Sequence, residues 1–143
     1  MLAAQAACAA SVSLLVIDAG EEGPEYSAMW ESRLFEAFFE SGIVATNSPR
    51  IRLGGAPVAD GFPPEAEAAR EGARLGGIDF LLVAIVDGAS RGFCLRLFSA
   101  ESGAMAALRS GGSTAGLCAR EERESISRAA MEMAWILRHG AAR

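Results

Sequence analysis

The chain contains no lysine: all 13 basic residues among its 143 are arginines. This absence excludes a Walker A phosphate loop, Schiff-base lysines, pyridoxal phosphate attachment and Ser–Lys hydrolase dyads. Histidine is nearly absent as well, since His139, close to the C-terminus, is the only one. Zinc sites built on paired histidines are therefore excluded, and a Ser–His–Asp triad would depend on a near-terminal residue. We expect a protein that is not an enzyme and that takes no cofactor.

The chain has fewer basic residues than acidic ones. The 13 arginines are outnumbered by 18 acidic residues, which gives a formal net charge of −5 at pH 7. Binding to nucleic acid needs clustered cations that displace counterions, so we expect no nucleic-acid partner. Apolar residues make up 51% of the chain, enough for one domain with a sizeable core. We therefore divide the chain into a leader, residues 1–10, and a single globular α/β domain, residues 11–143.

The leader resembles the end of a secretory signal followed by a lipidation cysteine. The small residues Ala6 and Ala7 precede Cys8, whereas Gln5 stands where an aliphatic residue is usual and no basic segment comes before it. The apolar run from Leu2 ends at Asp18, which is marginal for a membrane span. Two interpretations stay open: Cys8 is the site of a lipid anchor, or it is a small residue in a frayed leader.

The other two cysteines do not have the spacing of a metal site or a thioredoxin motif. Cys94 and Cys118 lie 24 positions apart, with no C-x-x-C arrangement. Cys94 falls within a strand pattern, where a buried thiol behaves as a small hydrophobic residue. In an oxidising compartment a disulfide between the two is the alternative.

The spacing of apolar residues predicts eight elements. Six consecutive apolar residues, 80–85, indicate a central strand that is buried on both faces. The second strand is expected to be interrupted by the turn-prone sequence Asn47-Ser48-Pro49. The predicted strands cover 11–18, 43–53, 78–88, 91–100 and 104–111, and the predicted helices cover 25–41, 63–76 and 119–139.

The order of these elements is β-α-β-α-β-β-β-α. Helical crossovers join the first three strands, which makes them parallel through right-handed connections. The two tight connections that follow make the last strands antiparallel. We therefore predict an α/β fold with a single mixed five-stranded sheet and helices packed on it.

This arrangement resembles the periplasmic and lipoprotein domains of the CsgG, LpoB and TolB N-terminal type. The matching passages are LLVID at 14–18, the helix ending in ESG at 40–42, AAREGARLGGIDFLLVAIVDG at 68–88 and the hairpin FCLRLFSAESGAMAALRSGG at 93–112. The resemblance implies a non-enzymatic domain of the bacterial cell envelope that binds an envelope protein or assembles with itself. It also implies a periplasmic location, with contact to the outer membrane only through a lipid anchor.

A rival hypothesis starts from acidic residues at strand ends. Asp18 and Asp87 end two strands that are predicted to be parallel, and the carboxyl ends of such strands are where open α/β sheets place ligands. With Glu22 they form an oxygen-rich set suited to Mg²⁺ or Ca²⁺, as in a small-ligand site or a metal-assisted hydrolase. The alternative is that both aspartates accept hydrogen bonds from turn backbone.

Aromatic residues are the candidates for a protein interface. Trp30, Phe38 and Phe39 lie in the first predicted helix and are candidates for an exposed residue at a partner interface, the alternative being that they pack against the sheet. Trp135 falls at the edge of the apolar stripe of the last helix. We name Trp135 and Trp30 as possible interface residues.

Overall fold

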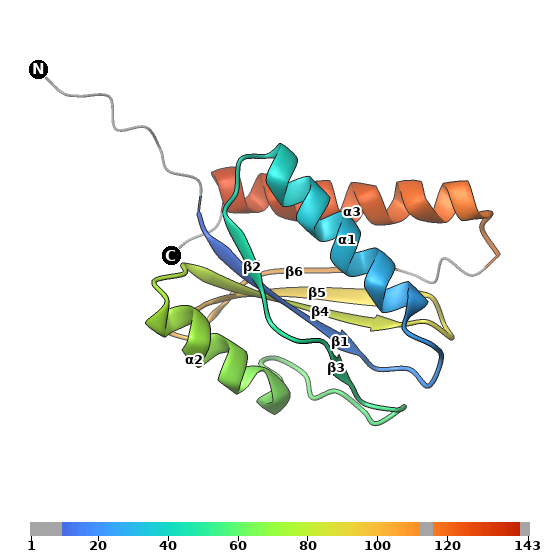
Figure 1. Ribbon diagram of the computed structural model, residues 1–143, viewed down its shortest axis with the longest axis horizontal. Helices are drawn as coiled ribbons and strands as arrows, with labels where there is room; N and C mark the ends of the chain where they lie inside the picture. Colours follow the sequence, from blue (N-terminus) through green and yellow to red (C-terminus); the bar gives the residue numbers. More distant parts are fainter. Residues whose placement is uncertain (1–9, 112–115, 141–143) are drawn as a thin grey trace, which may run out of the picture.

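The computed structural model describes residues 10–111 and 116–140 (Figure 1). It confirms a mixed α/β fold, although the sheet has six strands where the sequence predicted five. Cys8 and the rest of the leader before residue 10 lie outside the described ranges. In chain order the elements are β1 (Val12–Asp18), α1 (Glu25–Glu40), β2 (Ala45–Asn47), β3 (Ile51–Arg52), the short 3-10 helix η1 (Pro64–Ala66), α2 (Glu67–Leu75), β4 (Phe80–Asp87), β5 (Gly92–Ser99), β6 (Met105–Gly111) and α3 (Ala119–His139).

The sheet has the strand order β2-β1-β4-β5-β6, and β3 also pairs with β1. Strands β2, β3 and β4 all run parallel to β1, whereas β4, β5 and β6 form an antiparallel meander. These directions agree with the crossovers and tight turns expected from the sequence. The first strand of the chain therefore lies inside the sheet.

The extra strand arises because the predicted second strand is divided in two. Asn47 pairs with Leu14 and Ile51 pairs with Ile17, so this side uses one residue more than β1 over the same stretch. Pro49 lies in the gap and has no backbone N–H to donate to the ladder. The interruption predicted at 47–49 is thus the point at which pairing stops and resumes.

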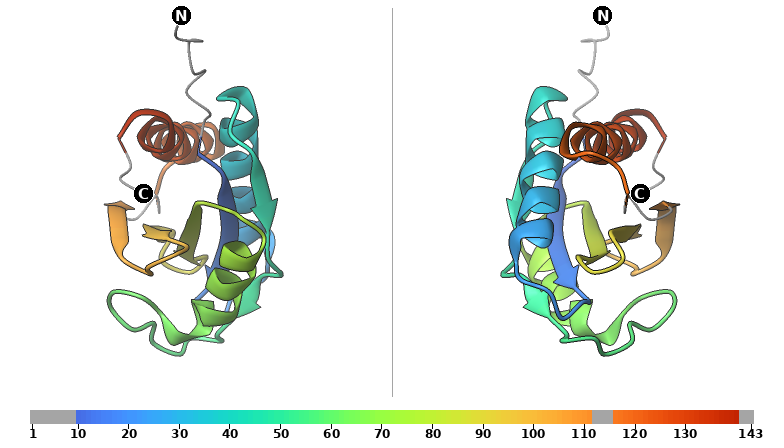
Figure 2. Two further views of the ribbon diagram at one scale, coloured as in Figure 1. Left: turned by 90° about the vertical axis from the view of Figure 1, so that its left-hand side faces the viewer. Right: turned by 90° about the vertical axis from the view of Figure 1, so that its right-hand side faces the viewer.

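The helices form a layer on each face of the sheet. Helices α1 and α3 cover one face side by side, and α2 covers the other (Figures 1 and 2). Alternate residues of β4 point to opposite layers: Leu82 joins the core under α1 and α3, and Leu81 joins the smaller core under α2. Both faces of β4 are buried, as its unbroken apolar run predicted.

Helix α1 supplies most of the buried aromatic side chains of the larger core. Trp30 and Phe38 are both 0% exposed, and the Trp30 ring lies 4.6 Å from that of Phe93 on β5. Truncating a large core aromatic residue typically costs about 3–5 kcal/mol. This apolar stripe is what fixes α1 to the sheet.

The smaller core is closed by the loop at 53–63. Phe62 packs edge-on against Phe98, with ring centroids 4.8 Å apart. Arg96, only 9% exposed, donates from Nη1 to the backbone carbonyls of Ala59 at 2.6 Å and Gly61 at 2.9 Å. The loop therefore lies over β5 as part of the core, held by a buried arginine.

Candidate functional site

Asp18 is the centre of a buried hydrogen-bond cluster at the end of β1. The residue is 2% exposed. Its Oδ1 accepts from the Gly20 N–H at 3.2 Å, and its Oδ2 accepts from the Ser27 hydroxyl, also at 3.2 Å. The guanidinium of Arg52 approaches Oδ2 at 3.9 Å from the solvent side. The carboxylate thus joins the end of β1 to the first turn of α1.

Asp87 and Glu22 have different surroundings. Asp87 Oδ1 accepts from the Ala89 N–H at 2.9 Å, which is the turn role weighed for it from the sequence. Glu22 is exposed, and its backbone carbonyl accepts from Arg52 at 2.5 Å. Within residues 10–111 and 116–140, no group of three or more His, Cys, Asp or Glu side chains is arranged to hold a metal ion. The structure does not bring Asp18, Glu22 and Asp87 together as such a group, and the metal site on these residues stays a prediction.

The interface candidates separate clearly by exposure. The suggestion that Trp30 is an interface residue is wrong for the isolated chain, because this side chain is fully buried. Phe39, nearer the end of the same helix, is 84% exposed, and Trp135 on α3 is 62% exposed. Trp135 thus stays a candidate, and Phe39 is the exposed residue among the three aromatic candidates in α1.

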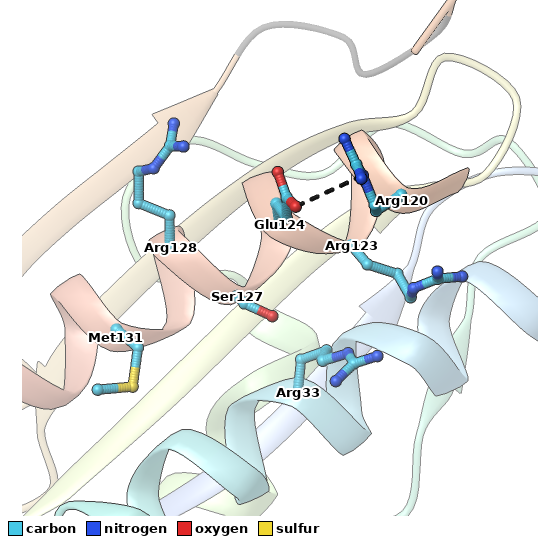
Figure 3. A pocket seen from close by; sticks show the side chains of 7 residues that line it. All are labelled: Arg33, Arg120, Arg123, Glu124, Ser127, Arg128 and Met131. Carbon is cyan, nitrogen blue, oxygen red and sulfur yellow. Dashed lines mark ion pairs between the residues drawn. The ribbon is translucent and has the colours of Figure 1, made fainter. Parts of the chain in front are cut away.

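An open groove runs between α1 and α3, and arginines dominate its walls (Figure 3). We call it the arginine groove; its volume is about 420 Å³. The sequence analysis missed it because one wall comes from α1 and the other from α3, far apart in the chain. Local charge was no signal either, because residues 119–128 hold three arginines and three glutamates. The groove is lined by Arg33, Arg120, Arg123, Glu124, Ser127, Arg128 and Met131.

The arginines of the groove differ in how they are neutralised. Arg33 pairs with Glu36 at 3.1 Å, and Arg120 pairs with Glu124 at 3.8 Å. Arg123 has no ion pair or hydrogen bond within the part of the chain that the structure describes. The groove therefore carries a surplus of positive charge.

A second hollow adjoins the groove along α3, since both include Arg128 and Met131. Trp135 and His139 form one side of it, with ring centroids 5.2 Å apart. Arg138 closes the end nearest α1 by donating to the carbonyl of Ser41 at 3.0 Å. The exposed face of α3 therefore carries the arginine groove near the start of the helix and the aromatic pair Trp135 and His139 near its end.

The two cysteines within the described ranges are not joined to each other. Cys94 and Cys118 are both free thiols, so the disulfide alternative is wrong for this structure. Cys94 Sγ lies 3.4 Å from Nε of Arg96, and the Cys118 thiol contacts Glu121 at 3.1 Å.

None of the helices in the described ranges combines the length and apolar character that a membrane span requires.

Shifted pKa values occur on α2, away from these features. A hydrogen bond from Arg70 holds the pKa of Glu67 below its ordinary value of 4.5, and Arg74 does the same for Glu71. The same contacts raise the pKa of both arginines. These are exposed i,i+3 ion pairs that support the helix.

Strand β6 forms one edge of the sheet. Within the described ranges it pairs with β5 alone. Two of its apolar side chains, Met105 and Leu108, are 42% and 47% exposed. The strand therefore presents unpaired backbone groups and apolar side chains together.

Comparison with known proteins identifies the fold. No protein-family model and no curated protein matches the sequence. Two dodecamer structures of PelC from Paraburkholderia phytofirmans do match, each at 16% identity. A single-substitution variant in space group C2 has a TM-score of 0.54, with 96% of each chain covered. The form in space group P6 has a TM-score of 0.52 and covers 95% of this chain and 91% of PelC. The chain has a fold similar to that of a PelC subunit.

TolB is a more distant match. The structure of TolB from Acinetobacter baumannii is 14% identical and covers 91% of this chain but 30% of TolB, with a TM-score of 0.42. A TolB structure is thus among the similar folds, as the sequence resemblance implied, but this similarity is too weak to carry an argument. The resemblance to CsgG and LpoB stays a prediction.

Proposed function

We propose that the chain is a non-enzymatic subunit that assembles with copies of itself in the bacterial cell envelope. The observation that carries this proposal is the fold shared with PelC over 96% of both chains. Both PelC structures are described as dodecamers, in two different crystal lattices. A subunit of similar size and fold has therefore been found in a dodecamer.

The edge strand β6 supports the proposal from the chain itself. Open edge strands are usually covered, shortened or protected by proline and lysine. Strand β6 is seven residues long and contains neither. Its exposed Met105 and Leu108 would be covered if a second copy packed against this edge.

If the copies assemble head to tail, each subunit also needs a second, different surface, because such a contact joins two distinct patches. The opposite edge of the sheet begins at β2, next to the turn that follows α1. Phe39 and Val44 flank this turn and are 84% and 63% exposed. The chain thus has exposed apolar residues at both edges of its sheet.

The envelope setting and the absence of catalysis rest on the sequence. The lipobox-like residues before Cys8 and the resemblance to CsgG, LpoB and TolB domains favour export. The lack of lysine and of paired histidines favours a binding role over catalysis. Within this proposal, an envelope protein partner is the alternative to a second copy.

Light scattering after size exclusion, across a series of protein concentrations, tests the assembly. The monomer has a mass of 14.9 kDa, and we expect a discrete multiple of this mass. Leu108→Arg places a charge at the edge strand and is expected to shift the protein toward monomer. The matched control, Leu108→Val, keeps an apolar strand-forming residue and should keep the assembly. A wild-type chain that stays monomeric at every concentration would contradict self-assembly and favour the adaptor alternative.

The envelope setting has its own test. The intact mass of the N-terminal peptide, taken from protein expressed at its native locus, reports whether Cys8 is processed. A lipid-modified Cys8 as first residue would support export and tethering. An intact Met1 with a free Cys8 would contradict the envelope setting without affecting the test of assembly.

A further inference from the structure

We propose that the arginine groove binds a phosphate group. This site is separate from the edge strand and from the assembly proposed above, so either proposal can fail alone. The centre of the site is formed by Arg33 on α1 and by Arg123 and Ser127 on α3.

The three side chains point into the same space. Figure 3 shows the guanidinium groups of Arg33 and Arg123 directed from opposite walls into the gap between the helices, with the Ser127 hydroxyl facing the same gap. Arg128 points to the other flank of α3, and Arg120 lies beside Glu124. The donors at the centre therefore come from two helices that the core holds in a fixed relation.

The number and type of donors favour phosphate over carboxylate. Each of the two guanidinium groups can donate two parallel hydrogen bonds to an oxyanion, and the serine hydroxyl can donate one more. A carboxylate has two oxygens, whereas a phosphate monoester presents three charged oxygens to donors from several directions. Two arginines from opposite walls, together with a serine hydroxyl that faces the same gap, match the larger acceptor. Clusters of arginine are a general means of recognising phosphate.

The charge balance favours an anion at this point. Of the two guanidinium groups at the centre of the groove, Arg33 has the exposed Glu36 as its carboxylate partner, and Arg123 has none among the described residues. An anion between Arg33 and Arg123 would neutralise both groups. The volume of about 420 Å³ lies within the range of small-molecule sites, about 300–1,000 Å³. The groove is open, so a phosphate attached to a larger group can enter.

Glu36 is the internal competitor for the same site. Its carboxylate accepts a hydrogen bond from Nη1 of Arg33 at 3.1 Å, the same donor from which a bound phosphate would accept. Removing this carboxylate should therefore strengthen binding, which few accidental effects would do. Glu40, on the same helix and exposed, offers a variant with the same change of net charge.

Calorimetric titration with inorganic pyrophosphate at low salt tests the site. We expect saturable binding, and we expect Arg33→Ala combined with Arg123→Ala to weaken it by at least about tenfold. Arg50→Ala combined with Arg109→Ala is the matched control, because both are exposed arginines outside the groove and the same number of charges is removed. Equal losses in the two double variants would overturn the proposal, as would the absence of saturable binding to the wild-type chain.

A second pair of variants, Glu36→Gln and its control Glu40→Gln, tests the site even if the double arginine variant folds poorly. Glu36→Gln is expected to tighten pyrophosphate binding by about threefold, since an exposed ion pair is worth under 1 kcal/mol. Glu40→Gln should leave the affinity unchanged. Equal gains in both variants would show a nonspecific effect of charge and would overturn the site. Malonate is the carboxylate probe, and binding as tight as that of pyrophosphate would overturn the preference for phosphate.

Vesicles distinguish the two sources of phosphate. Cosedimentation with phosphatidylglycerol vesicles that depends on Arg33 and Arg123, and that is lost with phosphatidylcholine vesicles, would identify a lipid headgroup. Binding of pyrophosphate without groove-dependent binding to either vesicle would identify a soluble phosphate ester. Both outcomes support the site and differ only in the source of the phosphate.

Discussion

Replacing Asp18 by alanine should destabilise the fold even when no metal is present. The carboxylate is 2% exposed and accepts hydrogen bonds from the Gly20 N–H and the Ser27 hydroxyl. Ser27 keeps a second acceptor, the carbonyl of Pro24 at 3.0 Å, but the buried Gly20 N–H loses its side-chain partner. A structural role and a metal-binding role for Asp18 predict different results from this change.

The magnitude follows from these contacts. An unsatisfied buried N–H costs about 1–3 kcal/mol, and a lost hydrogen bond to a charged acceptor adds an effect of similar size. Removing the carboxylate also removes the cost of burying it, which offsets part of the loss. We therefore expect Asp18→Ala to lower the free energy of unfolding by about 2–4 kcal/mol. For a chain of this size that corresponds to a fall in melting temperature of roughly 6–12 °C.

Urea unfolding followed by circular dichroism, with chelator and then with Mg²⁺ or Ca²⁺, measures the effect. Asp18→Asn keeps the shape and one acceptor oxygen, so its loss should be about half as large. Asp87→Ala, which removes a hydrogen bond to an exposed turn, should cost less than about 1 kcal/mol. The reasoning would be refuted if Asp18→Ala were as stable as the wild type. It would also be refuted if a metal ion stabilised the wild type and Asp18→Ala abolished that gain.

Three further results are expected. Arg96→Met removes the donor to two carbonyls of the loop at 53–63, so amide hydrogen exchange should rise in that loop far more than in the strands, and uniform exchange would contradict its role. Because the pKa values of Glu67 and Glu71 are lowered in the folded chain, their ion pairs should stabilise it above pH 4.5 and lose this effect as pH falls below it. The melting temperatures of the wild type and of the variant that combines Glu67→Gln with Glu71→Gln should therefore converge in acid. A difference that persists in acid would show that it does not come from these ion pairs. Trp135→Ser should remove the red-shifted part of the tryptophan fluorescence and leave the melting temperature unchanged, whereas a lower melting temperature would show that the side chain packs in the core.

The sequence predicted the elements that have strong apolar periodicity. The run at 80–85 was long and unbroken, so it predicted a strand buried on both faces, and β4 is such a strand. The interruption at Pro49 was visible because proline cannot donate to a ladder. Whether the chain resumes pairing after it depends on contacts with β1, which is why the strand count was harder to predict than the strand positions.

Side-chain roles were predicted less well, because they depend on the rotation of each helix and on neighbours from distant segments. Phe38 and Phe39 are adjacent and chemically alike, yet one is 0% and the other 84% exposed. The turn role weighed for Asp18 is fulfilled by the Gly20 N–H, but its hydrogen bond to the Ser27 hydroxyl depends on where α1 lies, which local sequence does not specify. The arginine groove needs α1 and α3 to lie side by side, which local sequence does not specify.

The position of β1 inside the sheet has a consequence for the order in which the molecule can form. Its N-terminal end is tied to residues far ahead in the chain, as in the contact between Ser11 and Asp79, 68 positions apart. Contacts of such long sequence separation must wait for the closure of a large loop and slow folding. Both cores contain residues of β4, so a nascent chain can complete neither core before β4 has emerged. Until then the apolar residues that precede β4 lack these packing partners and are accessible to chaperones.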